Sequence, residues 1–87
     1  MISFSGDLDL EVATATDPAT LLAPGIPGVV VDLSEVGFLD SSGINLLIKL
    51  RLRVEEVGAA MTVVGADAVR STLRFCGLLE FLGVRAA

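Results

Sequence analysis

The stretch VVVDLSEVGFLDSSGI, at positions 29–44, carries most of the information about how this 87-residue chain folds. Its first five residues, at 29–33, predict the clearest strand of the sequence. Three consecutive valines indicate a strand that is buried on both faces, as in a parallel sheet covered by helices. Asp40 is a favourable N-cap residue, so we expect a helix to begin directly after it. The stretch therefore predicts a strand that leads through a short turn into a helix.

Three further segments have the composition of strands. They are residues 2–4, residues 61–64 with Gly65 at their end, and, as a weaker candidate, residues 81–84. A turn is expected at Gly6-Asp7. Before position 29, three prolines break any long helix, which leaves two short helical pieces at 10–15 and 19–23.

Two longer helices are predicted between these strands. The first covers about 41–57 and stops at Gly58. The second covers about 68–76, with Asp67 as its N-cap and Gly77 at its end. Alternating strands and helices are typical of parallel crossover connections. We therefore predict a single α/β domain over residues 1–87, with a mainly parallel or mixed sheet of about four strands and helices packed on it.

The first of these helices has two apolar faces. At about 100° per residue, one broad face belongs on the sheet and contains Leu46, Leu47, Leu50, Val54 and Val57. A second stripe at i, i+4 and i+8, called the Ile44 stripe below, contains Ile44, Ile48 and Leu52. This stripe either packs against a neighbouring part of the same domain or is exposed as a docking surface for another protein. The spacing leaves both interpretations open.

Composition excludes several classes of function. The chain has no histidine, which rules out Ser-His-Asp and Cys-His catalytic sites and the usual imidazole metal sites. With 11 acidic and 6 basic residues and a net charge of −5, nonspecific binding to nucleic acid or to anionic membranes is not expected. No segment has the roughly 18 apolar residues that insertion into a membrane requires, and no secretory signal is visible. A single cysteine favours a reducing compartment, so we expect a cytoplasmic protein. Because the histidine-based catalytic sites are excluded, we also expect that the protein is not an enzyme.

Metal and cofactor sites are not predicted either. A metal site would need Asp40 together with Asp32 or Glu35, and these carboxylates have no recognisable ligand spacing. The chain also contains no glycine-rich phosphate loop of recognised spacing. We therefore expect neither a bound metal nor a cofactor.

The turn at 40–43, with the sequence DSSG, is the part of the chain most suited to chemistry. Ser41 and Ser42 fall in the first helical turn, where backbone N–H groups lack partners and an anion is favoured. Residues of these types also start helices without any further role. Nucleophilic catalysis by the serines lacks a base, because Lys49 lies roughly 10 to 12 Å further along the helix.

A serine that another protein modifies is the chemistry that remains. A phosphate on Ser41 would add about −1.5 to −2 charges beside Asp40. A partner docked over the turn would then meet a new charge and a new desolvation cost. Phosphorylation would release that partner with little refolding of the domain.

Residues 29–34 and 36–44 together resemble the core signature of STAS domains, the sulfate-transporter and anti-sigma-factor-antagonist domains. The likeness continues through GAAMTVVG at 58–65 and VRSTLRFCGL at 69–78. SGDLD at 5–9 resembles the family's early Gly-Glu-Leu-Asp segment. The resemblance thus covers nearly the whole chain.

The resemblance implies a phosphorylation switch. In the antagonist branch, an anti-sigma factor that is also a serine kinase phosphorylates the serine directly after the aspartate, which is Ser41 here. The unphosphorylated protein would bind this bacterial kinase and free the sigma factor for transcription, and the phosphoprotein would be released. Asp40, Ser42 and Gly43 match the positions that support the switch. The exposed part of the Ile44 stripe would be the docking surface.

Two features differ from the family pattern. Family members usually have another strand before the one expected at 2–4 and a further helix after the last strand, so the domain is expected to be shortened at both ends. The region of the first family helix is also interrupted by proline. Missing pieces would expose apolar surface, which a partner or a homo-oligomer would cover.

Two alternatives therefore stay open. One is a structural STAS subunit that docks on a transporter or signalling complex and is never phosphorylated. The other is nucleotide binding, which is reported for some relatives.

Overall fold

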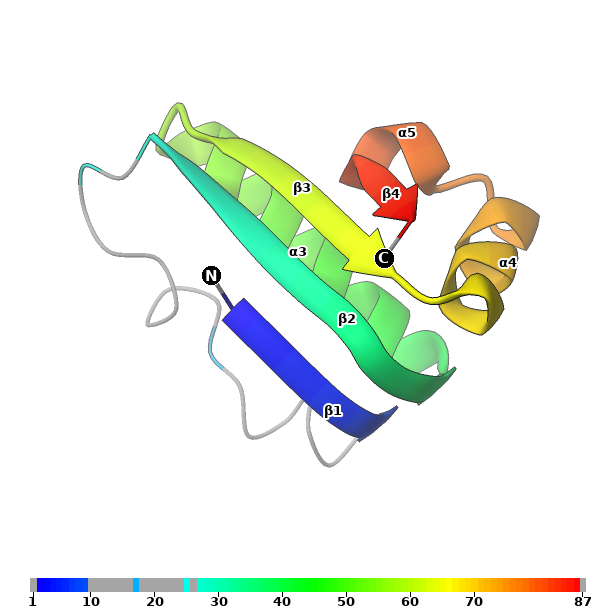
Figure 1. Ribbon diagram of the computed structural model, residues 1–87. Helices are drawn as coiled ribbons and strands as arrows, with labels where there is room; N and C mark the ends of the chain where they lie inside the picture. Colours follow the sequence, from blue (N-terminus) through cyan, green and yellow to red (C-terminus); the bar gives the residue numbers. More distant parts are fainter. Residues whose placement is uncertain (1, 10–16, 18–24, 26, 87) are drawn as a thin grey trace.

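The described residues form a four-stranded sheet in which neighbouring strands are parallel and follow one another in chain order, β1-β2-β3-β4 (Figure 1). The structure is a computed structural model that describes residues 2–9, 17, 25 and 27–86. Its elements are β1 (Ile2–Leu8), β2 (Gly28–Leu39), α3 (Ser41–Glu56), β3 (Ala60–Gly65), α4 (Asp67–Phe75), α5 (Leu79–Leu82) and β4 (Val84–Ala86). The predicted α/β class, with a mainly parallel sheet of about four strands, is confirmed.

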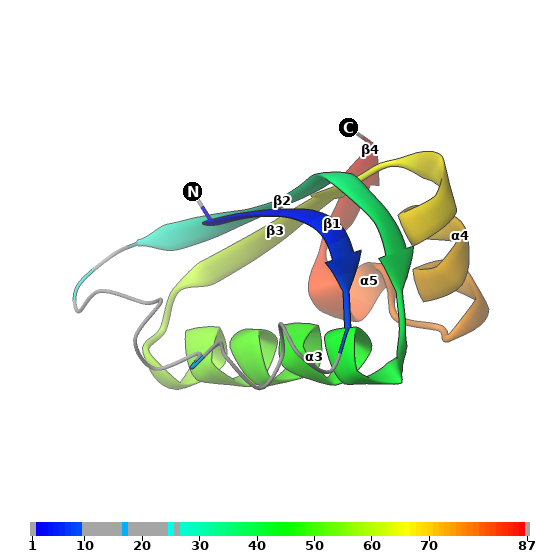
Figure 2. The same ribbon diagram turned by 90° about the horizontal axis from the view of Figure 1, so that it is seen from below.

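All three described helices lie on the same side of the sheet. Figure 2, which looks along the sheet, shows α3 and α5 below the strands and α4 beside the bent end of β2. Buried residues of all three helices belong to one core with the strands. The chain order of the strands explains this arrangement. Crossover connections between parallel strands have one hand, so successive connections that move across the sheet in the same direction place their helices on the same face. The described part of the molecule therefore has two layers, one of strands and one of helices.

The prediction that the valine-rich strand is buried on both faces was wrong. Along β2, Val29, Val31 and Leu33 are buried against the helices, whereas Val30 is 38% exposed. Successive side chains of a strand point to opposite faces, and no helix of the described residues covers the second face. The result is alternation between buried and exposed positions.

The broad apolar face of α3 lies on the sheet as predicted. Leu46, Leu47, Leu50 and Val54 are buried there, in one core with the inward residues of β2 and β3. Val57 is an exception and is 44% exposed. The helix ends at Glu56, so Val57 is the C-cap residue and turns away from the core. Gly58 follows it with a positive φ, as expected for the end of this helix.

The first strand continues further than predicted. It runs to Leu8, and Gly6 and Asp7 lie within it instead of forming a turn. The pairing with β2 shifts its register between these two residues, and again between Ser3 and Ser5. A shift of this kind absorbs an extra residue and bends a strand, which allows β1 to follow β2. The predicted helical pieces at 10–15 and 19–23 lie outside the described residues.

The last predicted strand is also corrected. Phe81 and Leu82 belong to the short helix α5, and the strand β4 begins only at Val84. Between them, Gly83 has a left-handed conformation with φ 68°. Leu82 is buried, since α5 packs it into the core before the chain turns into the strand.

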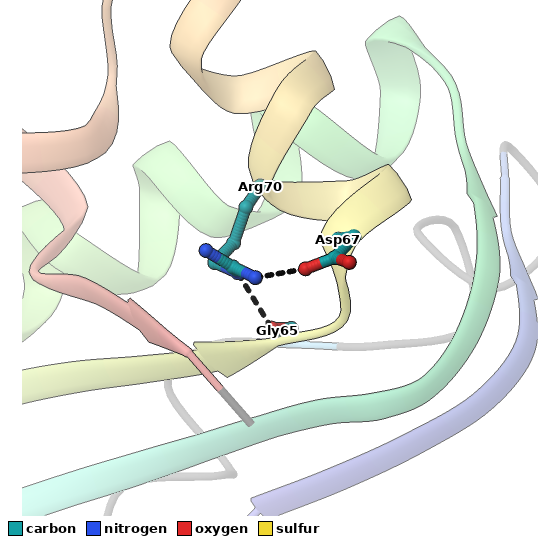
Figure 3. Close-up of polar contacts among 3 residues, drawn as sticks. All are labelled: Gly65, Asp67 and Arg70. Carbon is teal, nitrogen blue, oxygen red and sulfur yellow. Dashed lines mark hydrogen bonds and ion pairs between the residues drawn. The ribbon is translucent and has the colours of Figure 1, made fainter.

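At the start of α4, Asp67 is not the predicted N-cap. Ala66 occupies that position without a side-chain hydrogen bond, and Asp67 is the first helical residue. The Asp67 carboxylate pairs with Arg70, whose Nε donates a hydrogen bond to the Gly65 carbonyl oxygen at 3.2 Å (Figure 3). Arg70 therefore ties the first turn of α4 to the end of β3. Gly77, with a positive φ, follows the helix as predicted.

The connection from α5 to β4 generates a test of stability. A Cβ on Gly83 would lie 2.7 Å from the Met61 carbonyl oxygen, in addition to the left-handed backbone. Gly58 has a similar φ, but a Cβ there would meet nothing within 4 Å. We expect Gly58→Ala to cost about 1–2 kcal/mol and Gly83→Ala about 3 kcal/mol or more, because overpacking adds to the backbone strain. Urea unfolding of the two variants measures the difference, and equal losses would contradict this reading of the β3–β4 contact.

Candidate functional site

The turn between β2 and α3 is held by Asp40. Its Oδ1 accepts a hydrogen bond from the Gly43 backbone N–H at 3.0 Å, and its backbone carbonyl accepts one from the Ile44 N–H at 2.9 Å. Asp40 has extended backbone angles and is the N-cap of α3, as the sequence predicted. The N–H groups of Ser41 and Ser42 are left without an intrahelical partner, as they are at the start of every α-helix.

The first turn of α3 lies directly against the end of β1. The Asp40 N–H donates to the Leu8 carbonyl oxygen at 3.3 Å. A Cβ on Gly43 would lie 2.3 Å from the same oxygen and 2.8 Å from Cδ1 of Leu39. Only glycine fits at this position without a shift of the backbone, so Gly43 sets how closely the helix approaches the strand.

The two serines of the turn differ in exposure. Ser41, the first residue of α3, is exposed, and Ser42 is half-buried. The Ser41 hydroxyl has no hydrogen bond to another described residue, because the cap is made by Asp40. The ion pairs between Arg and acidic residues of α3 and α4 lie elsewhere, on α3 beyond its first turn and on α4. Ser41 therefore presents a hydroxyl that can be modified without breaking a contact of the fold.

The Ile44 stripe divides between the core and the surface. Ile44 is half-buried and packs against the core, Ile48 is half-buried, and Leu52 is 49% exposed. The stripe borders α5, because Arg51 on the same side of α3 has its Cζ 5.9 Å from the centre of the Phe81 ring. Arg51 also forms an ion pair with Glu55, one helical turn further along, at 3.3 Å. The packing interpretation thus fits Ile44, whereas the exposure that a docking surface requires is found at Leu52.

Sequence reasoning missed two residues beside the turn. Leu8 was not singled out, and only the parallel pairing of β1 with β2 brings its carbonyl to the helix. Phe38 is 53% exposed three positions before Ser41. Alternation from the buried Leu39 could have placed Phe38 on the outer face of the strand, but the assumption of two covered faces concealed it.

The acidic residues around the turn do not gather into a metal site. No group of three or more His, Cys, Asp and Glu side chains suited to a metal occurs among the described residues. Asp32 instead accepts a hydrogen bond from the Ser34 backbone N–H at 2.9 Å. The side chain of Ser34, followed by this backbone contact, holds the pKa of the Asp32 carboxyl below its ordinary value. Separately, no helix in the described part of the chain is long and apolar enough to span a membrane.

The contact at Gly43 gives a test in which two effects oppose each other. Alanine has the higher helix propensity, which favours Gly43→Ala by about 1 kcal/mol. The clash with the Leu8 carbonyl acts in the other direction, and overpacking of this kind costs typically about 1–3 kcal/mol. Because a Cβ would lie so close to a backbone atom, we expect a net loss of stability of about 1–2 kcal/mol. Chemical unfolding measures it; the control, Asn45→Ala on the exposed side of α3, should change stability by less than about 0.5 kcal/mol.

The fold is shared with several solved structures. A sulfate transporter family protein from Wolinella succinogenes superposes with a TM-score of 0.81 at 20% identity, covering 94% of this chain and 71% of that protein. An anti-sigma factor antagonist from Mycobacterium paratuberculosis gives 0.76 at 26% identity, covering 94% and 72%. The anti-sigma factor antagonist SpoIIAA, in its unphosphorylated form, gives 0.78 at 20% identity, covering 98% and 76%.

Sequence comparison identifies the family. No curated protein is similar enough in sequence to count as a match. The family model described as "Mlab, STAS domain", however, matches residues 1–83, which include every element up to α5 and the whole β2–α3 turn. The chain therefore belongs to the STAS-domain family.

Proposed function

We propose that this domain is a protein-binding module switched by phosphorylation of Ser41. Its partner is an anti-sigma factor with serine kinase activity, which binds the unphosphorylated domain and is released once Ser41 carries a phosphate. The domain, as a single unit over residues 1–87, then acts in bacterial transcription regulation in the cytoplasm and is itself no catalyst. The solved antagonists with the same fold support this proposal.

One observation carries the proposal: Ser41 is exposed, while its neighbour Asp40 makes the helix cap. A phosphate on Ser41 would thus leave the cap of α3 in place. It would carry about −1.5 to −2 charges, and the N-terminus of a helix stabilises nearby negative charge by typically about 0.3–1 kcal/mol. This gain offsets part of the repulsion from Asp40, so the folded domain tolerates the phosphate.

The effect of the phosphate is expected at the interface instead. A partner that covers the turn must remove water from whatever group Ser41 carries, and a phosphate is far more costly to desolvate than a hydroxyl. The turn itself, at residues 40–43, contains no Arg or Lys that could neutralise the new charge. Release therefore follows from charge and desolvation at a fixed surface, with Ser42 and Gly43 holding the turn in shape.

The second candidate function is a structural subunit of a transporter or signalling complex, in which Ser41 is never phosphorylated. One observation favours it: one solved structure with the same fold belongs to a sulfate transporter family protein. In that case the DSSG turn serves only to start α3 and to meet the end of β1.

Incubation with a purified anti-sigma factor kinase from the same organism and ATP separates the two candidates. We expect one phosphate, located on Ser41 by mass spectrometry, and none on the Ser41→Ala variant. Ser42→Ala is the matched control and should still be phosphorylated. A kinase that binds the domain but leaves Ser41 unmodified would rule out the switch and favour the structural subunit.

The Ile44 stripe supplies a second test of the same proposal. Leu52 lies 11 residues after Ser41, or about 16 Å along the helix, so a partner that covers both contacts most of one side of α3. We expect Leu52→Glu to weaken kinase binding by about tenfold or more, since it places a charge in an apolar contact. The fold should be kept, because Leu52 is half exposed.

Val57→Glu is the control for this variant. Val57 is similarly exposed but lies about 140° from Leu52 around the helix axis, so its charge should leave binding unchanged. Calorimetric titration of the kinase against both variants measures the contrast. Equal affinities would exclude Leu52 from the docking surface.

A further inference from the structure

The face of the sheet that points away from the helices is unusual for a parallel sheet. All-parallel sheets occur almost only where both faces are covered, because their connections place helices on them. Here the strands pair in parallel, and α3, α4 and α5 all lie on one side (Figure 2). No helix of the described residues covers the other side, which we call the open face. The side chains that the strands place on the open face therefore indicate what kind of partner would cover it.

The register of the strands places the residues of the open face. Val30 on β2 pairs with Thr62 on β3, and one row further along Asp32 pairs with Val64. The next strand outward, β4, adds Arg85 to that second row, opposite Val64. Val30 is exposed, and Val64 and Thr62 are half-buried. The middle of the open face therefore has two apolar positions, Val30 and Val64, whose partners across the two central strands are Thr62 and Asp32.

Acidic residues of the open face lie on β1 and on β2, which is one of the two central strands. Asp7, Asp32 and Glu35 each precede or follow a residue that is buried against the helices, so alternation directs them to the open face. None of the three forms an ion pair with another described residue. The hydrogen bond from the side chain of Ser34, and after it the one from the Ser34 backbone, hold the pKa of the Asp32 carboxyl below its ordinary value. Both contacts favour the charged form of this carboxylate.

The basic residues lie almost entirely on the other side of the molecule. Of the 6 Lys and Arg residues of the chain, all of which are described, only Arg85 is on the open face. The others are on α3 and α4: Lys49, Arg51, Arg53, Arg70 and Arg74. Three of them are already paired with acids of their own helix. Among the described residues, therefore, no Lys or Arg forms an ion pair with Asp7, Asp32 or Glu35.

We propose that the open face is a second docking surface, which binds an amphipathic helix of a partner protein with an apolar stripe flanked by Lys or Arg. The stripe covers Val30, Thr62 and Val64, and the basic residues meet Asp7, Asp32 and Glu35. A helix is the form that fits. The backbone groups of β2 pair with β1 and β3, and those of β3 with β2, so the partner is recognised through side chains. It covers the face on which no helix of the described residues lies.

This proposal is independent of the switch at Ser41. Ser41 begins α3, in the helix layer, whereas the open face lies on the opposite side of the sheet (Figure 2). A partner bound to the open face should therefore remain bound whether or not Ser41 is modified. The two surfaces would allow the domain to hold one protein while it exchanges another.

The test uses the full chain and a synthetic helical peptide, made of Leu on one face and Lys on the other, together with a counterpart in which Glu replaces Lys. We expect the Leu/Lys peptide to shift the NMR methyl signals of Val30 and Val64. The methyls of Val31 and Val63, which are buried on the helix side of the same strands, should not move. The Leu/Glu peptide should not bind, and added salt should weaken the Leu/Lys complex.

Charge reversal tests the role of the acidic residues on the open face. We expect the double variant Asp7→Lys, Glu35→Lys to weaken peptide binding by about tenfold or more, since attraction is replaced by repulsion at two positions. The control, Glu56→Lys with Glu80→Lys, changes the net charge equally on exposed residues of α3 and α5 and should bind within about twofold of the unmodified chain. The Ser41→Glu variant should also bind as the unmodified chain does.

Several results would overturn the proposal. Equal weakening by both double variants would mean that the peptide responds only to net charge. Unmoved methyls of Val30 and Val64 would remove the face from consideration. Shifts of these methyls with protein concentration alone would assign the face to a second copy of the chain. Loss of binding in Ser41→Glu would mean that the two surfaces are one site.

Discussion

The close approach of α3 to the end of β1 is the constraint on which the rest of the site depends. The Leu8 carbonyl accepts from the Asp40 N–H, and Gly43 leaves no room for a side chain beside it. Once Gly43 faces β1, the rotation of the whole helix is fixed. Ser41 lies about 200° from Gly43 around the helix axis, which directs its side chain to solvent, and the leucines of the next turn face the sheet. A packing contact thus determines which serine another protein can reach.

Much of the architecture follows from local chemistry that can be read in the sequence. The valine-rich segments are strands, Asp40 caps α3, and glycines follow both longer helices. The errors occur where local chemistry fits two structures. The segment Phe81 to Val84 is short and apolar, so it suits a helix or a strand equally, and burial of Leu82 by the core decides between them. The burial of Val30 was predicted wrongly for a similar reason. Valine favours a strand whether or not its side chain is covered, so three valines in a row do not show that both faces of the strand are buried.

In the candidate site, too, some features could be predicted from the sequence and others could not. The position of Ser41 after a capping aspartate depends on neighbours in the chain, so the sequence could indicate it. The contact of Gly43 with Leu8 joins residues far apart in the chain, and only the register of β1 against β2 creates it. The contact of Arg51 with Phe81 is also tertiary and links α3 to α5. Helical spacing showed that the Ile44 stripe exists, but it could not show that Leu52 is exposed while Ile44 packs against the core.

The chain order of the strands also bears on how the sheet assembles. Each described strand pairs only with its neighbours in the chain, so no strand has to be inserted between two that are already joined. The unit β2–α3–β3 contains most of the buried leucine and valine residues and can form first. Growth then proceeds outward at both edges, and each step closes a loop of modest length at a modest entropic cost. The order that leaves one face of the sheet open therefore also gives the domain a simple folding route.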